Sequence, residues 1–108
     1  MSVLEKDKVD GIALKNNTTI VLMISDHLDW SDEYSHLLIL QEKINAYIGF
    51  CENKQYSQIY KDIKIEKFVF EIHFLYEITD KAREFLTQVQ NQLCEADFLI
   101  EYNISSNN

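Results

Sequence analysis

The sequence predicts an α+β domain with the element order β-β-α-β-α-β, folded as a four-stranded mixed sheet with two helices packed on one face. Three observations support this class. Two apolar stretches flank an Asn-Asn pair, which is typical of a β-hairpin. Two later stretches carry apolar residues at helical spacing, and a stretch between them alternates with a period of two. Because each helix would connect two strands, a right-handed crossover between parallel strands is expected for at least one helix.

The hairpin is expected to consist of residues 9–15, a turn at Asn16-Asn17, and residues 18–25. Asparagine tolerates the left-handed backbone that tight hairpin turns require. The second strand is apolar on both faces, which favours a central place in the sheet. One of its faces carries Ile20, Leu22 and Ile24, and the other carries Val21 and Met23. Residues 1–8 are largely charged and are expected to form a loose arm.

A long helix is expected over residues 30–53. Asp29 is the favoured N-cap because its carboxylate can accept from backbone N–H groups of the first turn, with Ser31 as the alternative. Asn53 would end the helix in a left-handed conformation. The main apolar stripe consists of Leu37, Leu40, Ile44, Tyr47, Ile48 and Cys51, and a narrower second stripe consists of Ile39, Ala46 and Phe50. A helix that is apolar on two sides is expected to contact two partners.

Residues 54–66 predict either a further helical turn or an irregular connection. Residues 67–78 predict a strand with aromatic residues, including Phe74 and Tyr76, on its core face. Thr79 or Asp80 is expected to cap a second helix over residues 81–95, and residues 98–104 predict the last strand. Residues 1–108 are expected to form a single domain with a frayed tail at residues 105–108.

The composition excludes several classes of function. The chain has a net charge of -8 and only ten basic residues, of which Arg83 is the one arginine, so binding of a nucleic-acid backbone is not expected. Two glycines and no proline exclude the glycine-rich loops that hold nucleotide phosphates. No stretch predicts a membrane span or a signal peptide, and Cys51 and Cys94 are expected to be free thiols in a reducing cytoplasm.

A candidate site lies where the second strand meets the long helix, at Asp26, His27, Asp29 and Trp30. Glu77 would join this rim if the strand at residues 67–78 runs parallel beside the second strand. Carboxylates with an imidazole can bind a divalent ion or perform acid–base chemistry. The alternative is structural: Asp29 caps the helix, Trp30 anchors its first turn and His27 lies on the surface. His36 and His73 are also expected on the surface, and no cofactor or metal is assigned.

Surplus apolar positions form a candidate interface. Ile39, Ala46 and Phe50 face away from the main helical stripe, and Val21, Met23, Val69 and Leu75 face away from the helices. Large contiguous apolar surface usually marks an interface, so self-association or a protein partner is expected. The alternative is that the hairpin, residues 54–66 or the N-terminal arm covers these positions.

The run Ile24-Ser-Asp-His-Leu-Asp-Trp30 is followed by Tyr34-Ser-His36-Leu-Leu and Leu40-Gln-Glu-Lys-Ile-Asn-Ala-Tyr47. These segments resemble a family of small bacterial proteins of unknown function, over most of the chain. The resemblance implies a bacterial source and a stand-alone domain of this length. It implies no activity, cofactor or catalytic residue.

The sequence therefore predicts a non-enzymatic module that binds a protein partner or itself, most simply as a homodimer. A more specific version is an acidic inhibitor or immunity-type protein that neutralises a basic partner. The alternative is a metal-assisted or acid–base enzyme that uses Asp26, His27 and Asp29.

Overall fold

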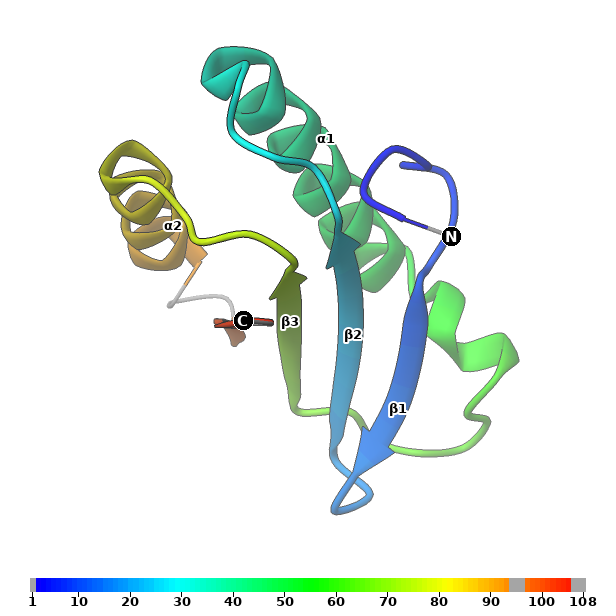
Figure 1. Cartoon of the computed structure of the whole chain (residues 1–108). Helices are drawn as coiled ribbons and strands as arrows, with labels where there is room; N and C mark the ends of the chain where they lie inside the picture. The colour runs from blue at the N-terminus through cyan, green and yellow to red at the C-terminus, as the bar shows by residue number, and fades with distance from the viewer. Residues whose placement is uncertain (1, 94–96, 106–108) are drawn as a thin grey trace.

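The computed structural model describes residues 2–93 and 97–105 (Figure 1). The elements follow the order β1 (Gly11–Lys15), β2 (Thr19–Asp26), α1 (Glu33–Glu52), the 3₁₀ helix η1 (Gln55–Gln58), β3 (Lys67–Phe74), α2 (Asp80–Leu93) and β4 (Phe98–Ile104). This order confirms the predicted α+β class and its β-β-α-β-α-β succession.

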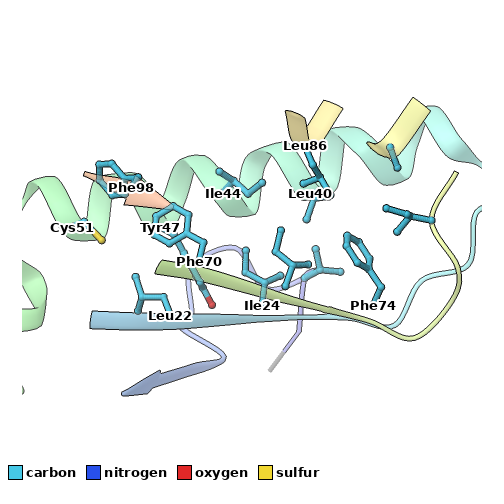
Figure 2. Packing of buried hydrophobic residues seen from close by; sticks show 14 of the residues in the cluster. Leu22, Ile24, Leu40, Ile44, Tyr47, Cys51, Phe70, Phe74, Leu86 and Phe98 are labelled. Carbon is cyan, nitrogen blue, oxygen red and sulfur yellow. The ribbon is translucent and has the colours of Figure 1, made fainter. Parts of the chain in front are cut away.

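The four strands form one mixed sheet in the order β1-β2-β3-β4. β1 and β2 are antiparallel, whereas β2, β3 and β4 are parallel to one another. Two crossovers, through α1 and α2, step across the sheet in the same direction. Right-handed crossovers that step in one direction place their helices on one face, and both helices lie on one side of the sheet (Figures 1 and 2).

The hairpin turn has the geometry that its two asparagines favour. Asn16 and Asn17 have φ angles of 56° and 62°, and the N–H of Thr18 donates to the carbonyl of Lys15 at 3.3 Å. Two consecutive left-handed residues match the right-handed twist of the flanking strands. β2 pairs with β1 on one side and β3 on the other, so its predicted central position is confirmed.

One hydrophobic core fills the space between the sheet and the helices. The three inner faces of β2, β3 and β4 supply alternate residues to it, and α1 and α2 cover them (Figure 2). Its buried members include Ile20, Leu22, Ile24, Leu40, Ile44, Tyr47, Phe70, Ile72, Phe74, Leu86 and Phe98. The predicted main stripe of α1 therefore faces the sheet.

Both ends of α1 differ from the prediction. Asp32, not Asp29 or Ser31, is the N-cap, and its carboxylate accepts from the backbone N–H of Ser35 at 3.2 Å. At the other end Asn53 has φ −86°, and the left-handed residue is Lys54 with φ 55°. Each boundary is displaced because the hydrogen bonds of the cap, not the preference of one residue, decide where the helix ends.

β3 is shorter than predicted. It ends at Phe74, level with Asp26 at the end of β2, where the N–H of Leu75 donates to the carbonyl of Asp26 and the chain then turns towards α2. Tyr76, expected on the core face, is 48% exposed, whereas Ile78 is buried outside the strand.

Thr79 is the cap of α2, since its hydroxyl accepts from the N–H of Ala82 at 3.0 Å. The predicted last turn of this helix, up to Glu95 and including Cys94, lies outside the described residues, as do residues 106–108 of the predicted tail. The bounds of β4 agree with the prediction. Residues 54–66 combine both predicted alternatives, with the short helix η1 followed by an irregular connection.

The N-terminal arm packs against the fold instead of lying loose. Val3 is 1% exposed and belongs to the core cluster. Its N–H donates to the carbonyl of Ser25 at 2.9 Å. The arm therefore lies beside the end of β2, on the side of the sheet that carries the helices.

Candidate functional site

The structure separates the residues predicted at the junction of β2 and α1. Asp26 is the last residue of β2 and points into the core, where it is 1% exposed. His27, Asp29 and Glu77 are exposed. The carboxylate of Asp29 accepts from the backbone N–H and the hydroxyl of Ser31 at 3.1 Å and 2.7 Å. These bonds to Ser31 hold the pKa of Asp29 below its ordinary value.

His36 is the residue that Asp26 contacts, and it was expected on the surface. It is 2% exposed, and its Nε2 atom lies 2.8 Å and 2.6 Å from the two carboxyl oxygens of Asp26. The indole of Trp30 stacks on its imidazole with a centroid separation of 3.6 Å. The prediction for His36 was wrong because the stripe of α1 extends one turn towards its N-terminus, from Leu40 to His36.

The hydrogen bonds of His36 define how its protons are arranged. Its Nδ1 atom lies 3.0 Å from the carbonyl of Asp29, which can only accept, so Nδ1 carries a proton. A second proton lies between Nε2 and the carboxyl group of Asp26. Burial raises the pKa of Asp26, and the hydrogen bond to His36 opposes part of this rise. With either placement of the second proton the pair has no net charge.

A second buried polar cluster was not predicted at all. The ammonium group of Lys43 is 0% exposed and donates to the carbonyls of Glu5 and Lys8 at 2.6 Å each and to the carboxylate of Asp10 at 3.0 Å. Its three protons thus each have an acceptor. Lys43 lies on the same helical stripe as Leu40 and Tyr47, and extending this stripe through polar residues would have identified it.

The cluster around Lys43 joins three parts of the chain. Asp10 also accepts from the backbone N–H of Ser25 at 2.9 Å, and its own N–H donates to the hydroxyl of Tyr47 at 2.9 Å. The Tyr47 hydroxyl in turn donates to the carbonyl of Met23. The cluster therefore fixes the arm and the start of β1 to β2 and α1, which is a structural role.

Neither cluster has the form of a reactive centre. Asp26, His36 and Lys43 are closed off from solvent, so a substrate cannot reach them. Among the residues that the structure describes, no group of three or more His, Cys, Asp or Glu side chains is arranged to hold a metal ion.

The predicted interface residues of α1 occupy two environments. Ile39 and Phe50 pack partly against the core, and Ala46 and Phe50 line a groove of about 270 Å³ between α1 and the N-terminal arm. Leu75 lies beyond the end of β3 and is exposed. These four residues therefore do not form one continuous surface with the predicted interface residues of the sheet.

Val21, Met23 and Val69, in contrast, lie on one surface, which we call the open face. It is the side of the sheet opposite the helices, and within the described part of the chain neither helix lies over it (Figure 1). The register places Ala13, Val21, Val69 and Leu99 side by side, one from each strand. These four residues form an apolar row across the entire sheet.

Ala13 and Leu99 were not among the predicted interface residues. Alternation along β1 and β4 assigns each to a face, but only the register shows that they align with Val21 and Val69. Met23 extends the row, because its side chain lies against Gly11 of the neighbouring strand. Parallel strands usually have both faces covered, so an apolar row on an uncovered parallel sheet is unusual.

These features define a small α+β domain in which a mixed sheet leaves one face uncovered. A family model described as a family of unknown function (DUF6572) matches residues 1–106, so the chain belongs to that family. This confirms the expected membership in a family of unknown function. No match was found among curated proteins or among solved structures. In the described residues no helix has the length and apolar character to cross a membrane.

Proposed function

We propose that this protein is a non-enzymatic protein-binding module whose docking surface is the open face of the sheet. The observation that carries the proposal is the apolar row of Ala13, Val21, Val69 and Leu99 on a face that neither helix covers. Ala13 is exposed and Val21 and Leu99 are partly exposed, whereas Val69 is only 8% exposed. A docked protein would remove the exposed parts of Ala13, Val21 and Leu99 from water, which favours association.

The polar clusters support this proposal over the enzymatic alternative. Asp26 and His36 neutralise each other inside the core, and Lys43 has all its donors occupied. Side chains held in this way have no free position for a substrate. Their arrangement supports a role in holding the sheet, arm and helix together behind the open face.

The proposal includes a reducing cytoplasmic setting in a bacterial cell. The reducing setting is supported by Cys51, which is free, since free thiols are typical of a reducing compartment. Burial raises the pKa of this thiol to about 12, which keeps it in the unreactive protonated form. Such a cysteine acts as a small apolar core residue.

Site-specific photo-crosslinking in native cells tests the docking surface. A benzophenone-bearing amino acid is introduced at position 13, on the open face, and in a matched protein at position 34 on α1, where Tyr34 is 74% exposed. We expect defined adducts from position 13 alone, and their loss when Met23→Lys is added on the same face. Equal adducts from both positions, or none from position 13 in protein shown to be folded, would overturn the proposal.

A further inference from the structure

We infer that the free edge of β4 binds an extended segment of a partner protein, which adds to the sheet as a fifth strand beside α2. This is a second binding site, and it does not require the open face to bind a protein. The inference follows from the backbone groups that β4 leaves unpaired and from a pocket that α2 and β4 form beside them.

β4 uses only half of its backbone groups to pair with β3. The N–H of Phe68 donates to the carbonyl of Asp97 at 3.0 Å, and the N–H of Ser105 donates to the carbonyl of Phe74 at 2.8 Å. With the parallel register between these two contacts, the odd-numbered residues of β4 bond to β3. The even-numbered residues therefore direct their N–H and C=O groups away from β3, along what we call the outer edge.

Gln90 of α2 binds the outer edge as a neighbouring strand would. Its Nε2 atom donates to the carbonyl of Phe98 at 3.2 Å, and its Oε1 atom accepts from the N–H of Ile100 at 2.6 Å. A carboxamide carries the same kinds of donor and acceptor as a peptide unit. The outer edge is therefore in a conformation that binds a peptide unit, and α2 lies close enough to flank a segment bound there.

The rest of the outer edge has no partner in the described part of the chain. Its unpaired groups are the carbonyl of Ile100 and the N–H and C=O groups of Tyr102 and Ile104. Natural sheets usually protect such edges by short strands, lysine, proline or bulges. β1, at the opposite edge, has five residues and ends in Lys15, whereas β4 has seven residues and contains neither lysine nor proline. β4 is thus the edge suited to strand addition.

A pocket of about 220 Å³ lies between α2 and β4 beside these groups. Leu86, Ile100 and Tyr102 supply apolar surface to it. Of the described residues that line it, only Arg83 is charged, and Asp80 pairs with it at 3.1 Å. The volume is below the roughly 300–1,000 Å³ of pockets that hold small-molecule ligands. Because every second side chain of an added strand points to the helix side, the pocket fits one apolar side chain of the segment.

An extended segment suits this edge better than a second copy of the chain. In a second copy α2 flanks the same edge of β4, so pairing through β4 would bring two helices together at one groove. Each copy would also carry a net charge of -8, which opposes association. A segment that carries no helix and is not strongly acidic has neither disadvantage.

Selection from a phage-displayed library of random heptapeptides against the full chain tests the inference. We expect binders that share one apolar position. When the residues of a selected peptide are N-methylated one at a time, every second position should weaken binding at least about tenfold, and the positions between should weaken it less than about threefold. This period of two is expected because only alternate N–H groups of an added strand face β4.

Tyr102→Pro removes an N–H of the outer edge and leaves the bonds to β3, because proline is tolerated where its nitrogen faces away from the neighbouring strand. We expect it to bind the selected peptide at least about tenfold more weakly than the matched Tyr102→Val, which also lacks the phenol but keeps the N–H. If thermal melting shows that Tyr102→Pro unfolds, Ile104→Pro and Ile104→Val replace the pair.

Amide hydrogen exchange of the wild type locates the bound peptide. Exchange should slow at Tyr102 and Ile104, whose N–H groups gain a partner. Ile100 is the internal control, because its N–H is already bonded to Gln90 and should change little.

A library that yields no binder overturns the inference. So do N-methylation losses without a period of two, equal binding by Tyr102→Pro and Tyr102→Val, or protection of β1 in place of β4. A wild type that dimerises in analytical ultracentrifugation with protection at Tyr102 and Ile104 would replace the segment by a second copy. Position 13 lies on β1, at the opposite edge of the sheet, so its adducts report on the open face alone. Either proposal can therefore fail without the other.

Discussion

The Nε2 atom of His36 lies 2.6 Å from the nearer carboxyl oxygen of Asp26, and the contact joins the start of α1 to the end of β2. Trp30 covers the imidazole and is tilted against Phe74 with a centroid separation of 6.1 Å. A charge buried without its partner is costly, so neither residue can be lost alone without penalty. This pair therefore holds the first turn of α1 against the end of β2.

Asp26→Asn tests the raised pKa of the buried carboxyl group. The folded protein binds this proton more tightly than the unfolded chain. The contribution of Asp26 to the unfolding free energy is therefore largest below its ordinary pKa of 3.8. It is lost as the pH rises through the raised pKa of the folded state. We expect the unfolding free energy of the wild type, minus that of Asp26→Asn, to fall with rising pH when both are measured by urea denaturation.

Asp29→Asn is the matched control, because its pKa is shifted in the opposite direction by Ser31. The stability due to Asp29 is present above pH 3.8 and is lost as the pH falls through its lowered pKa. With rising pH, the unfolding free energy of the wild type minus that of the variant should therefore fall for Asp26→Asn and rise for Asp29→Asn. Slopes of the same sign would contradict the structural assignment of the two carboxyl groups.

Lys43→Met tests the buried cluster that holds the N-terminal arm. It leaves the carboxylate of Asp10 and the carbonyls of Glu5 and Lys8 without the ammonium group, so we expect a loss of about 3–5 kcal/mol in unfolding free energy. Lys6→Met is the control, since the ion pair of Lys6 with Glu42 at 3.4 Å is exposed and its loss should cost below about 1 kcal/mol. Chemical denaturation measures both, and equal losses would argue against the cluster.

Asp32→Ala tests the N-cap of α1. Loss of the bond from the N–H of Ser35 should lower stability by about 1 kcal/mol. Asp29→Ala should have a smaller effect, because the carboxylate of Asp29 accepts from the loop residue Ser31 and its bond from His36 is made by the backbone carbonyl, which alanine retains. Thermal melting ranks the two variants, and the reverse order would return the cap to Asp29.

Gly49→Ala should stabilise the protein. Gly49 lies within α1, and a Cβ atom added there meets no atom within 4 Å. Alanine in a helix interior is favoured over glycine by about 1 kcal/mol, so we expect an increase of that size in unfolding free energy. Denaturant unfolding measures it. A decrease would mean that the groove beside Gly49 is filled in solution.

Hydrophobic periodicity predicted the elements because it is a local property. Alternation at Ile20, Leu22 and Ile24 and the stripe through Leu40, Ile44 and Tyr47 identified which faces are buried. Periodicity did not identify His36 and Lys43, because a polar residue on an apolar stripe can be buried only if distant groups bond to it. Their partners Asp26 and Asp10 are supplied by other strands, which spacing along the chain does not show.

The end of β3 and the cap of α1 were misplaced for a related reason. Tyr76 continues the alternation of β3, yet the neighbouring strand β2 ends at Asp26, and its pairing with β3 reaches only Phe74. Asp29 and Asp32 are equally good caps by residue type. Which of them faces the free N–H groups depends on the path of the loop, and that path follows from packing Trp30 on His36.

The sequence by itself determined the class, the succession of elements and the apolar character of both faces of β2. These depend on residue type and spacing, which act within a few residues. The tertiary structure decided which buried polar groups pair and how residues from four strands align as the apolar row. Alignment and pairing depend on register and on the side to which each crossover turns, and these are set only when distant segments pack together.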